Sequence, residues 1–294
     1  MTYGSENGSS VVRRWQLAAL LKSLREQAGL TQEQVIERLR SAGGKWSHSK
    51  LSRVENREYA VKPREAEQLL DIYGVRDVDR RGEVLQLAST ARGRGWWTSF
   101  ATDLPGDVRP LLSIESELVA VRDFQNMLVH GLLQTADYTR ALMNTVNPAL
   151  FAPEDLERRV AARMVRQQLL NRAEPPQLHF ILDQVILDRV VGRPSVMRDQ
   201  LRKLLDVTEQ PNITIQILPH EAGGSPGLEG PFSILTLPDP IPDIGYTEGP
   251  AGSLYIEDRE QVRTRTLRFG ILTRMALSRT ESADLIAATM KRYE

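Results

Sequence analysis

Hydrogen-bond donors and cations are concentrated between residues 48 and 53, and few of the polar side chains there are bulky. The polar residues of this segment are His48, Ser49, Lys50, Ser52 and Arg53. An arginine fork matches the O6 and N7 acceptors of guanine in the major groove of DNA, and short polar side chains can donate to other base edges. The segment therefore predicts base recognition, with an ordinary solvated helix face as the alternative.

Two short helices joined by a turn would position these side chains. Thr31 is suited to cap the first helix, and a glutamine follows three residues later, where a capping box requires Glu or Gln. Ala42-Gly43-Gly44 ends this helix, because glycine adopts the left-handed conformation that ends helices. The second helix would begin after Ser47 and bury Leu51 and Val54. This pattern predicts a helix-turn-helix, in which the second helix enters the major groove.

The segment resembles the XRE family of lambda-repressor-like helix-turn-helix proteins, through TQEQV at 31–35 and S-x-S-x-L-S-R-V-E-N at 47–56. The resemblance implies that Gln32 touches a phosphate and that the recognition helix starts at Ser47. It also places base contacts at His48, Ser49, Lys50 and Arg53. The remaining expected DNA contacts are Thr31, Lys45, Ser52, Asn56 and Arg57.

This chain departs from the family pattern at two places. The glycine that usually follows Glu55-Asn56 is Arg57 here. The turn before the recognition helix is also longer than usual, because Gly43-Gly44-Lys45 adds residues ahead of Trp46. The insertion bears on the angle of the recognition helix and leaves the motif itself intact.

Charge distribution supports nucleic-acid binding at one end of the chain. Lys and Arg total 38, as do Asp and Glu, over 294 residues. Between residues 13 and 64, however, 12 basic residues face 5 acidic ones. A basic N-terminal part on a mildly acidic remainder is typical of a DNA-binding domain joined to a domain with another task.

Several classes of protein are excluded by the composition. The absence of cysteine rules out disulfides and thiolate chemistry. Residues 1–10 do not resemble a signal peptide, and no run reaches the roughly 18 apolar residues of a membrane helix. We therefore expect a cytoplasmic protein without membrane contact.

Apolar periodicity and breaker residues predict a multidomain chain. Residues 1–11 are polar and should form a disordered tail. An all-α helix-turn-helix domain is expected at 12–75, and a connecting helix with a Gly/Arg linker at 76–95. The helix at 77–91 could equally be the last member of the bundle. The C-terminal domain, which would sense a signal or bind a partner, should occupy 96–294.

The C-terminal domain shows a mixture of helical and strand patterns. Helices are expected at 135–146, 153–170, 185–191, 194–207, 259–276 and 281–292. Strands are expected at 118–124, 179–182, 213–218, 232–237, 244–248 and 254–257, several of them separated by Pro/Gly turns. This mixture predicts an α+β, or mixed α/β, fold.

The sequence HGLLQTADY at 130–138 resembles the PGLLQT-x-x-Y stretch in the C-terminal domain of actinobacterial XRE regulators of the WhiJ type. Segments at 163–167, 211–219 and 230–235 resemble that domain too, whereas His130 and Gln184 replace its usual Pro and Glu. Such regulators are described as antitoxin-like and are commonly encoded beside a small BldB-like partner protein. The resemblance implies either a ligand or a partner protein for this domain.

Two functions follow from these patterns. The first is a sequence-specific regulator, most simply a repressor, which binds a pseudo-palindromic operator as a homodimer and senses a small molecule or small protein. The second is an antitoxin-like module that neutralises a small partner and regulates itself through DNA binding. The residues expected to line a pocket are Trp96, Trp97, Arg163, Gln167 and Tyr246. For the tryptophans and arginines, core packing and a solvated helix face are the alternatives.

Catalysis has little support in the sequence. Residues 223–227 match the G-x-S-x-G nucleophile pattern, but Pro226 directly after the serine would remove an oxyanion donor. No histidine follows His220, and the four histidines lack metal-ligand spacing. We therefore expect neither an enzyme nor a bound cofactor or metal.

Overall fold

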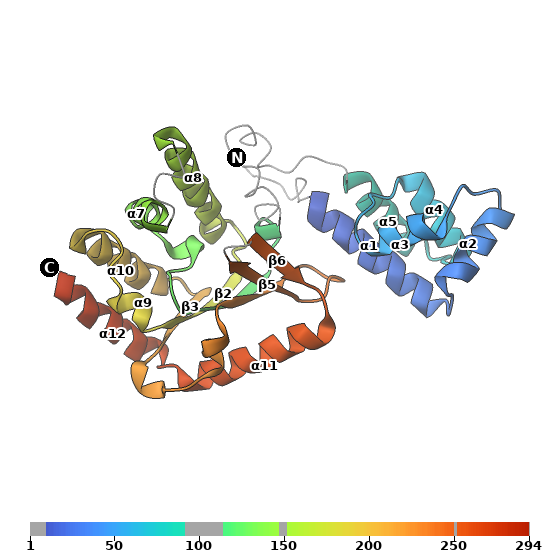
Figure 1. Ribbon diagram of the computed structural model, residues 1–294. Coiled ribbons are helices and arrows are strands. Elements are labelled where there is room, and N and C mark those ends of the chain that lie inside the picture. Colours follow the sequence, from blue (N-terminus) through green and yellow to red (C-terminus); the bar gives the residue numbers. More distant parts are fainter. Residues whose placement is uncertain (1–9, 92–113, 147–151, 250–251, 294) are drawn as a thin grey trace. The chain divides into compact units, whose positions relative to one another are not determined.

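The computed structural model describes residues 10–91, 114–146, 152–249 and 252–293 (Figure 1). The chain divides into two compact units: one holds the helices before residue 92, and the other holds a six-stranded sheet with its helices. The predicted fold class, an all-α domain followed by an α+β domain, is confirmed. The predicted linker at 92–95 and both Trp96 and Trp97 lie outside the described residues.

Within residues 10–91 the first unit has five helices: α1 Ser10–Gln27, α2 Gln32–Ser41, α3 His48–Glu55, α4 Pro63–Ile72 and α5 Val78–Thr90. Their shared core combines leucines of α1 with apolar residues of the other four helices. The first helix begins at Ser10, so the last two residues of the segment predicted as a tail are helical. Residues 1–9 are not among the described residues.

The fifth helix belongs to the bundle and does not serve as a connector. It packs against α1 and α4, and its Val84 and Ala88 are fully buried in the common core. The domain boundary expected at residue 75 therefore falls short of this helix. Gly74 ends α4 with a φ of 72°. In the sequence, a glycine that ends a helix inside a domain looks the same as one that ends the domain.

The second unit is built on one mixed sheet. Its strands are β1 Ala120–Gln125, β2 Gln177–Asp183, β3 Ile213–Leu218, β4 Phe232–Thr236, β5 Ile244–Gly249 and β6 Gly252–Ile256. They lie in the order β3-β2-β1-β4-β5-β6. The first three are parallel, and β4, β5 and β6 add an antiparallel meander on the other side of β1.

Helices connect the parallel strands and cover the sheet. The longer ones are α7 Ala136–Val146, α8 Pro153–Arg166, α10 Pro194–Thr208, α11 Arg259–Met275 and α12 Arg279–Met290. The short ones are η2 Gly131–Leu133, η3 Gln167–Asn171, α9 Val185–Asp188, η4 His220–Ala222, η5 Pro226–Glu229 and η6 Lys291–Tyr293.

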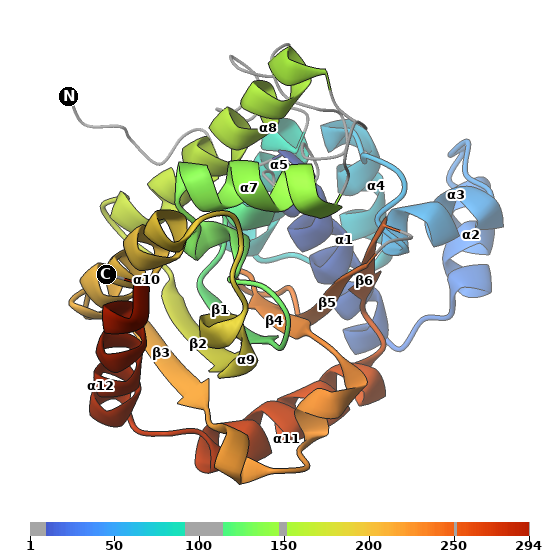
Figure 2. The ribbon, with the colours of Figure 1, turned by 60° about the vertical axis from the view of Figure 1, so that its left-hand side comes forward.

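The two faces of the sheet are covered by different helices (Figures 1 and 2). On one face α11 packs Phe269 and Leu272 against Phe124 of β1 and Ile181 of β2. The crossover helices α7, α8 and α10 lie on the opposite side. Both faces are therefore covered, and three consecutive residues of β2, Phe180 to Leu182, are fully buried.

The G-x-S-x-G match lies in an irregular segment between β3 and β4. Ser225 caps the short helix η5, and its hydroxyl accepts a hydrogen bond from the Gly227 amide at 3.2 Å. A Cβ at Gly227 would meet the Phe124 ring at 2.3 Å, so only glycine fits here. The serine is thus a capping residue outside any strand–turn–helix, and the segment is held to β1.

Candidate nucleic-acid interface

The first helix of the motif is capped as the sequence predicts. The amide of Gln34 donates to Thr31 Oγ1 at 3.2 Å, and the Thr31 amide donates to Gln34 Oε1 at 2.9 Å. Val35, Ile36 and Leu39 are buried in the core. This reciprocal capping box fixes the start of α2.

Two glycines end α2 for different reasons. Gly43 has a φ of 76°, and its amide donates to the Arg40 carbonyl. The Gly44 amide donates to the Leu39 carbonyl at 2.8 Å, and a Cβ on Gly44 would lie 2.9 Å from that oxygen. This bonding is the Schellman arrangement, in which the chain reverses directly after the helix.

The lengthened turn is anchored by a tryptophan. Trp46 is 5% exposed, and its Nε1 donates to Gln68 Oε1 of α4 at 2.9 Å. The inserted residues therefore end on a fixed point, and Lys45 remains exposed ahead of it. The buried Trp46 side chain therefore fixes the position at which α3 begins.

Helix α3 has one buried face and one exposed face. Ser47 caps it by accepting a hydrogen bond from the Lys50 amide at 3.1 Å, and Leu51 and Val54 are fully buried. His48 and Ser49 in its first turn are exposed. Short donors at the start of a helix are well placed to reach base edges, because recognition helices contact bases with their N-terminal residues.

Arg53 extends this exposed face by one turn. Its side chain is 56% exposed, and its Nε lies 3.8 Å from Glu58 Oε2. The guanidinium carbon is 6.0 Å from the centre of the Tyr59 ring. A long, solvent-exposed pair of this kind is weak, so the fork can leave it to bond a guanine.

Lys50 does not lie on the outward face that the sequence predicts. Its Nζ is 2.6 Å from Glu65 Oε1 and lies over the Trp46 ring at 4.3 Å from its centre. The Tyr59 ring is also close, at 5.3 Å. These partners come from the turn, from α4 and from the segment before α4, so local periodicity could not reveal them.

Gln32 is also engaged inside the domain. Its Nε2 donates to Glu55 Oε2 at 2.7 Å, and Glu55 also accepts two hydrogen bonds from the Arg25 guanidinium at 2.6 and 3.0 Å. Arg25 in addition donates to the Leu30 carbonyl at 2.7 Å. This cluster, hereafter the Glu55 cluster, joins α1, α2 and α3.

The residues after α3 end the helix. Asn56 donates through its Nδ2 to Ser52 Oγ at 3.4 Å, so both side chains already share a contact. Arg57 has a φ of 66°, a left-handed conformation that glycine adopts more readily than other residues. Its guanidinium lies over the Trp15 ring of α1, 5.1 Å from the centre.

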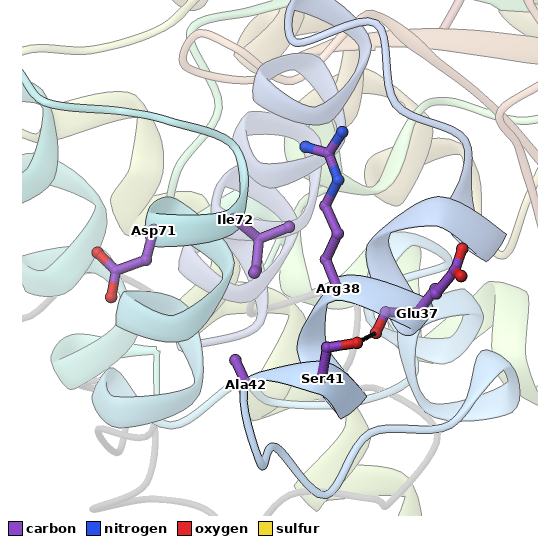
Figure 3. Close-up of a pocket in the computed structure, with 6 residues that line it drawn as sticks. All are labelled: Glu37, Arg38, Ser41, Ala42, Asp71 and Ile72. Atoms are coloured by element: carbon purple, nitrogen blue, oxygen red, sulfur yellow. Dashed lines mark hydrogen bonds between the residues drawn. The ribbon is translucent and has the colours of Figure 1, made fainter.

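A hollow between α2 and α4 differs in chemistry from the α3 face (Figure 3). It is lined by Glu37, Arg38, Ser41, Ala42, Asp71 and Ile72. Two of these six residues carry carboxylates and one carries a guanidinium, so the lining has a net negative charge, which disfavours phosphates. The surface suited to nucleic acid is therefore α3 together with the turn that precedes it.

We predict that Glu65→Gln strengthens binding to DNA of any sequence. Glu65 holds the Lys50 ammonium, and its loss would free that cation for a phosphate. One further phosphate contact should make the negative slope of log affinity against log salt concentration steeper by about one unit. Fluorescence anisotropy across a salt series measures this, with Glu67→Gln on the exposed face of α4 as the control. An unchanged slope would contradict the release of Lys50.

The same carboxylate should make stability depend on pH. Burial opposes ionisation of Glu65, but hydrogen bonds from Lys50, the Lys62 amide and Tyr59 outweigh it and lower its pKa below the ordinary 4.5. A lowered pKa stabilises the fold above the unfolded value, and this contribution disappears as the pH falls through the folded value. Glu65→Gln should therefore flatten the loss of stability below about pH 4.5.

The second unit brings two of the predicted pocket residues together around Gln134, which sequence reasoning missed. Arg163 donates to Gln134 Oε1 at 2.7 Å, and Gln167 donates to the Gln134 carbonyl, also at 2.7 Å. Lys203 of α10 bonds that same carbonyl at 2.9 Å and also the Gln167 side chain. Burial lowers the pKa of Lys203. We refer to these four residues as the Gln134 hub.

Tyr246 lies apart from the hub, on β5. Its hydroxyl bonds Ser253 Oγ at 3.0 Å and Glu248 Oε2 at 3.3 Å, and its ring contacts that of Tyr255. Burial raises the pKa of Tyr246 to about 12. Arg163 and Gln167 share the hub, whereas Tyr246 belongs to a separate aromatic pair.

Within residues 10–91, 114–146, 152–249 and 252–293, no three His, Asp or Glu side chains are grouped as a metal site would need. Among the helices that the structure describes, none has the length and apolar character needed to cross a membrane.

Comparison with known families assigns both parts of the chain. A model described as a helix-turn-helix domain matches residues 16–83, which supports a DNA-binding regulator and points away from an enzyme. A model described as a domain of unknown function, DUF5753, matches residues 108–288, more than half of the chain. No curated protein and no solved structure matches the sequence. The chain therefore belongs to the DUF5753 family and carries a helix-turn-helix domain ahead of that domain.

Proposed function

We propose that this protein is a sequence-specific transcriptional repressor of the XRE type that binds a pseudo-palindromic operator as a homodimer. The observation that carries the proposal is the exposed row of His48, Ser49 and Arg53 on a capped helix whose Leu51 and Val54 are fully buried. Such a helix presents donors to the major groove while its other face is held by the core.

The structure separates the proposed DNA contacts into two groups. Arg53 reads a guanine, His48, Ser49 and Ser52 bond neighbouring base edges, and Thr31, Lys45, Ser47 and Asn56 approach the phosphates. The second group is Gln32, Lys50 and Arg57, which are half-buried and whose side chains contact other helices of the domain. These three must exchange partners on binding, so they contribute less than the first group.

We infer dimerisation from the small size of the surface with which one chain would contact DNA. One recognition helix contacts too few bases and phosphates for a tight complex. Two helices on half-sites about one helical turn apart double these contacts and give the operator its two-fold symmetry. DNA binding would place the protein in the cytoplasm of a bacterial cell.

The C-terminal domain, which resembles that of WhiJ-type regulators, regulates DNA binding in this proposal by binding a small molecule or a small partner protein. The Gln134 hub supports this role, because it joins α8, η3 and α10 to the residue after η2 through polar groups that a ligand could compete for. Such a ligand must bind the DNA-competent and incompetent forms with different affinity, since equal affinity shifts nothing.

The test combines operator mapping with a measurement of mass. Bound genomic fragments should share a pseudo-palindrome, and light scattering should show two chains on it. A single chain on an asymmetric site would contradict the proposal. A second test replaces residues 96–294 with a coiled coil that dimerises the helix-turn-helix domain. This fusion should bind the operator but should not respond to the inducing condition. A retained response would show that sensing does not reside in the C-terminal domain.

A further inference from the structure

Helix α11 carries an exposed stripe with the spacing of a coiled-coil seam. Its inner face buries Val262, Phe269 and Leu272 against the sheet. Its outer face presents five residues at intervals of four, three, four and three: Glu260, Thr264, Leu267, Ile271 and Arg274. This interval pattern is the one by which two helices pack side by side.

The centre of the stripe is apolar and accessible. Leu267 is 60% exposed and Ile271 is 37% exposed, although both lie on a helix whose other side is fully packed. Beside them, a Cβ on Gly270 would meet nothing nearer than Arg274 Nη1, at 4.0 Å. The small residue leaves room for another backbone to approach closely.

The charges at the two ends of the stripe specify the partner. Glu260 and Arg274 each lie seven residues from Leu267, on opposite sides of it. In an antiparallel pair of α11 helices centred on Leu267, each Glu260 meets the Arg274 of the other copy. A parallel pair would place like charges together, and antiparallel helix dipoles also attract.

We propose that the protein dimerises through antiparallel packing of α11 on α11 of a second copy, with Leu267 next to the two-fold axis. This inference rests on the homodimer of the proposed function and assigns its surface. The contact is isologous, so the same residues serve both copies and the assembly closes at two chains.

The seam is short, and this determines the strength expected. A pair of 17-residue helices buries less than the roughly 1,600 Å² of a standard interface. The free protein should therefore dissociate on dilution, and a shared operator should restore the dimer. The interface would then couple operator occupancy to protein concentration.

Cysteine crosslinking tests the position of the axis. The chain has no cysteine, so Leu267→Cys introduces a single thiol. Mild oxidation should link most of the protein into covalent dimers, because an antiparallel seam brings the two thiols together. Leu254→Cys, on β6 at a matching 62% exposure, is the control and should crosslink at least tenfold more slowly. Equal rates for the two variants would overturn the proposed seam.

Charge reversal tests the orientation. Glu260→Arg and Arg274→Glu should each weaken dimerisation at least tenfold in sedimentation experiments, and the double exchange should return it to within about threefold of the original. Glu260 lies 4.0 Å from Arg263 in its own helix, so thermal unfolding of each variant checks that α11 is intact. Failure of the double exchange to rescue intact single variants would overturn the antiparallel pairing.

The outcomes separate this inference from the function on which it rests. If the unmodified protein is a monomer both free and on operator DNA, the proposed homodimer and this interface both fail. If it is a dimer that Leu267→Glu leaves unchanged, the homodimer stands and α11 is not its interface.

Discussion

Glu55→Gln should lower the free energy of unfolding of the helical unit by an amount toward the lower end of about 3–5 kcal/mol, because it leaves the buried Arg25 guanidinium with only the exposed Glu26 carboxylate, 3.7 Å away, as a counterion. The side chains of Arg25 and Glu55 are only 11% and 4% exposed. The hydrogen bond to Glu55 raises the pKa of the Arg25 guanidinium. Without that bond the guanidinium still stays charged, because the intrinsic basicity of arginine keeps it protonated in proteins. Urea unfolding followed by circular dichroism measures the loss, and amide exchange assigns it to α1, α2 and α3.

The double variant Arg25→Met with Glu55→Met distinguishes the net contribution of the ion pair from the cost of leaving one buried charge unpaired. Replacing both charges by apolar groups of similar volume should recover most of the stability, since buried pairs contribute little beyond their own desolvation. Glu67→Gln is the surface control; Glu67 is 56% exposed with Arg81 at 3.9 Å, and its loss should change stability by less than about 0.5 kcal/mol. A Glu55→Gln variant within 1 kcal/mol of the original protein would show that water reaches the Glu55 cluster.

Arg53→Ala should weaken binding to the operator by about 1–3 kcal/mol and relax specificity at one base pair in each half-site. The change removes a bidentate contact to guanine and leaves the fold intact, because the Arg53 side chain is largely exposed. Selection from randomised operators measures the relaxed position, and anisotropy measures the affinity.

Lys45→Ala is the matched comparison for Arg53→Ala. Lys45 is exposed in the turn before α3 and should bond a phosphate, so its loss should weaken all sequences alike and lower the salt slope by about one unit. If Arg53→Ala keeps the original ratio of operator to random affinity, Arg53 does not read a base.

These predictions distinguish two uses of charge in one small domain. Arg25 and Lys50 are bound by carboxylates and hold the helices together, whereas Lys45 and Arg53 face solvent. The excess of basic residues in the N-terminal sequence therefore overstates the cations available to DNA. Salt dependence, which counts contacted phosphates, measures the difference directly.

Local chemistry determined the elements, and the sequence was sufficient to predict them. Caps at Thr31 and Ser47 lie within three residues of the amides that they accept from, so the sequence contains both partners. The spacing of apolar residues likewise shows in the sequence which face of α3 is buried and where along the chain the strands lie. In the second unit, strand β3 coincides with the predicted segment 213–218.

Tertiary contacts decided which of the candidate side chains are available to contact DNA or a ligand. Lys50 meets Glu65 across 15 residues and Gln32 meets Glu55 across 23, and neither distance can be read from helical periodicity. The hub that joins Arg163, Gln167 and Lys203 to Gln134 likewise spans up to 69 residues. The strand order was equally hidden, because β4 crosses to the free edge of β1. A side chain's partner depends on which distant segments the core brings beside it, and only the folded chain supplies that information.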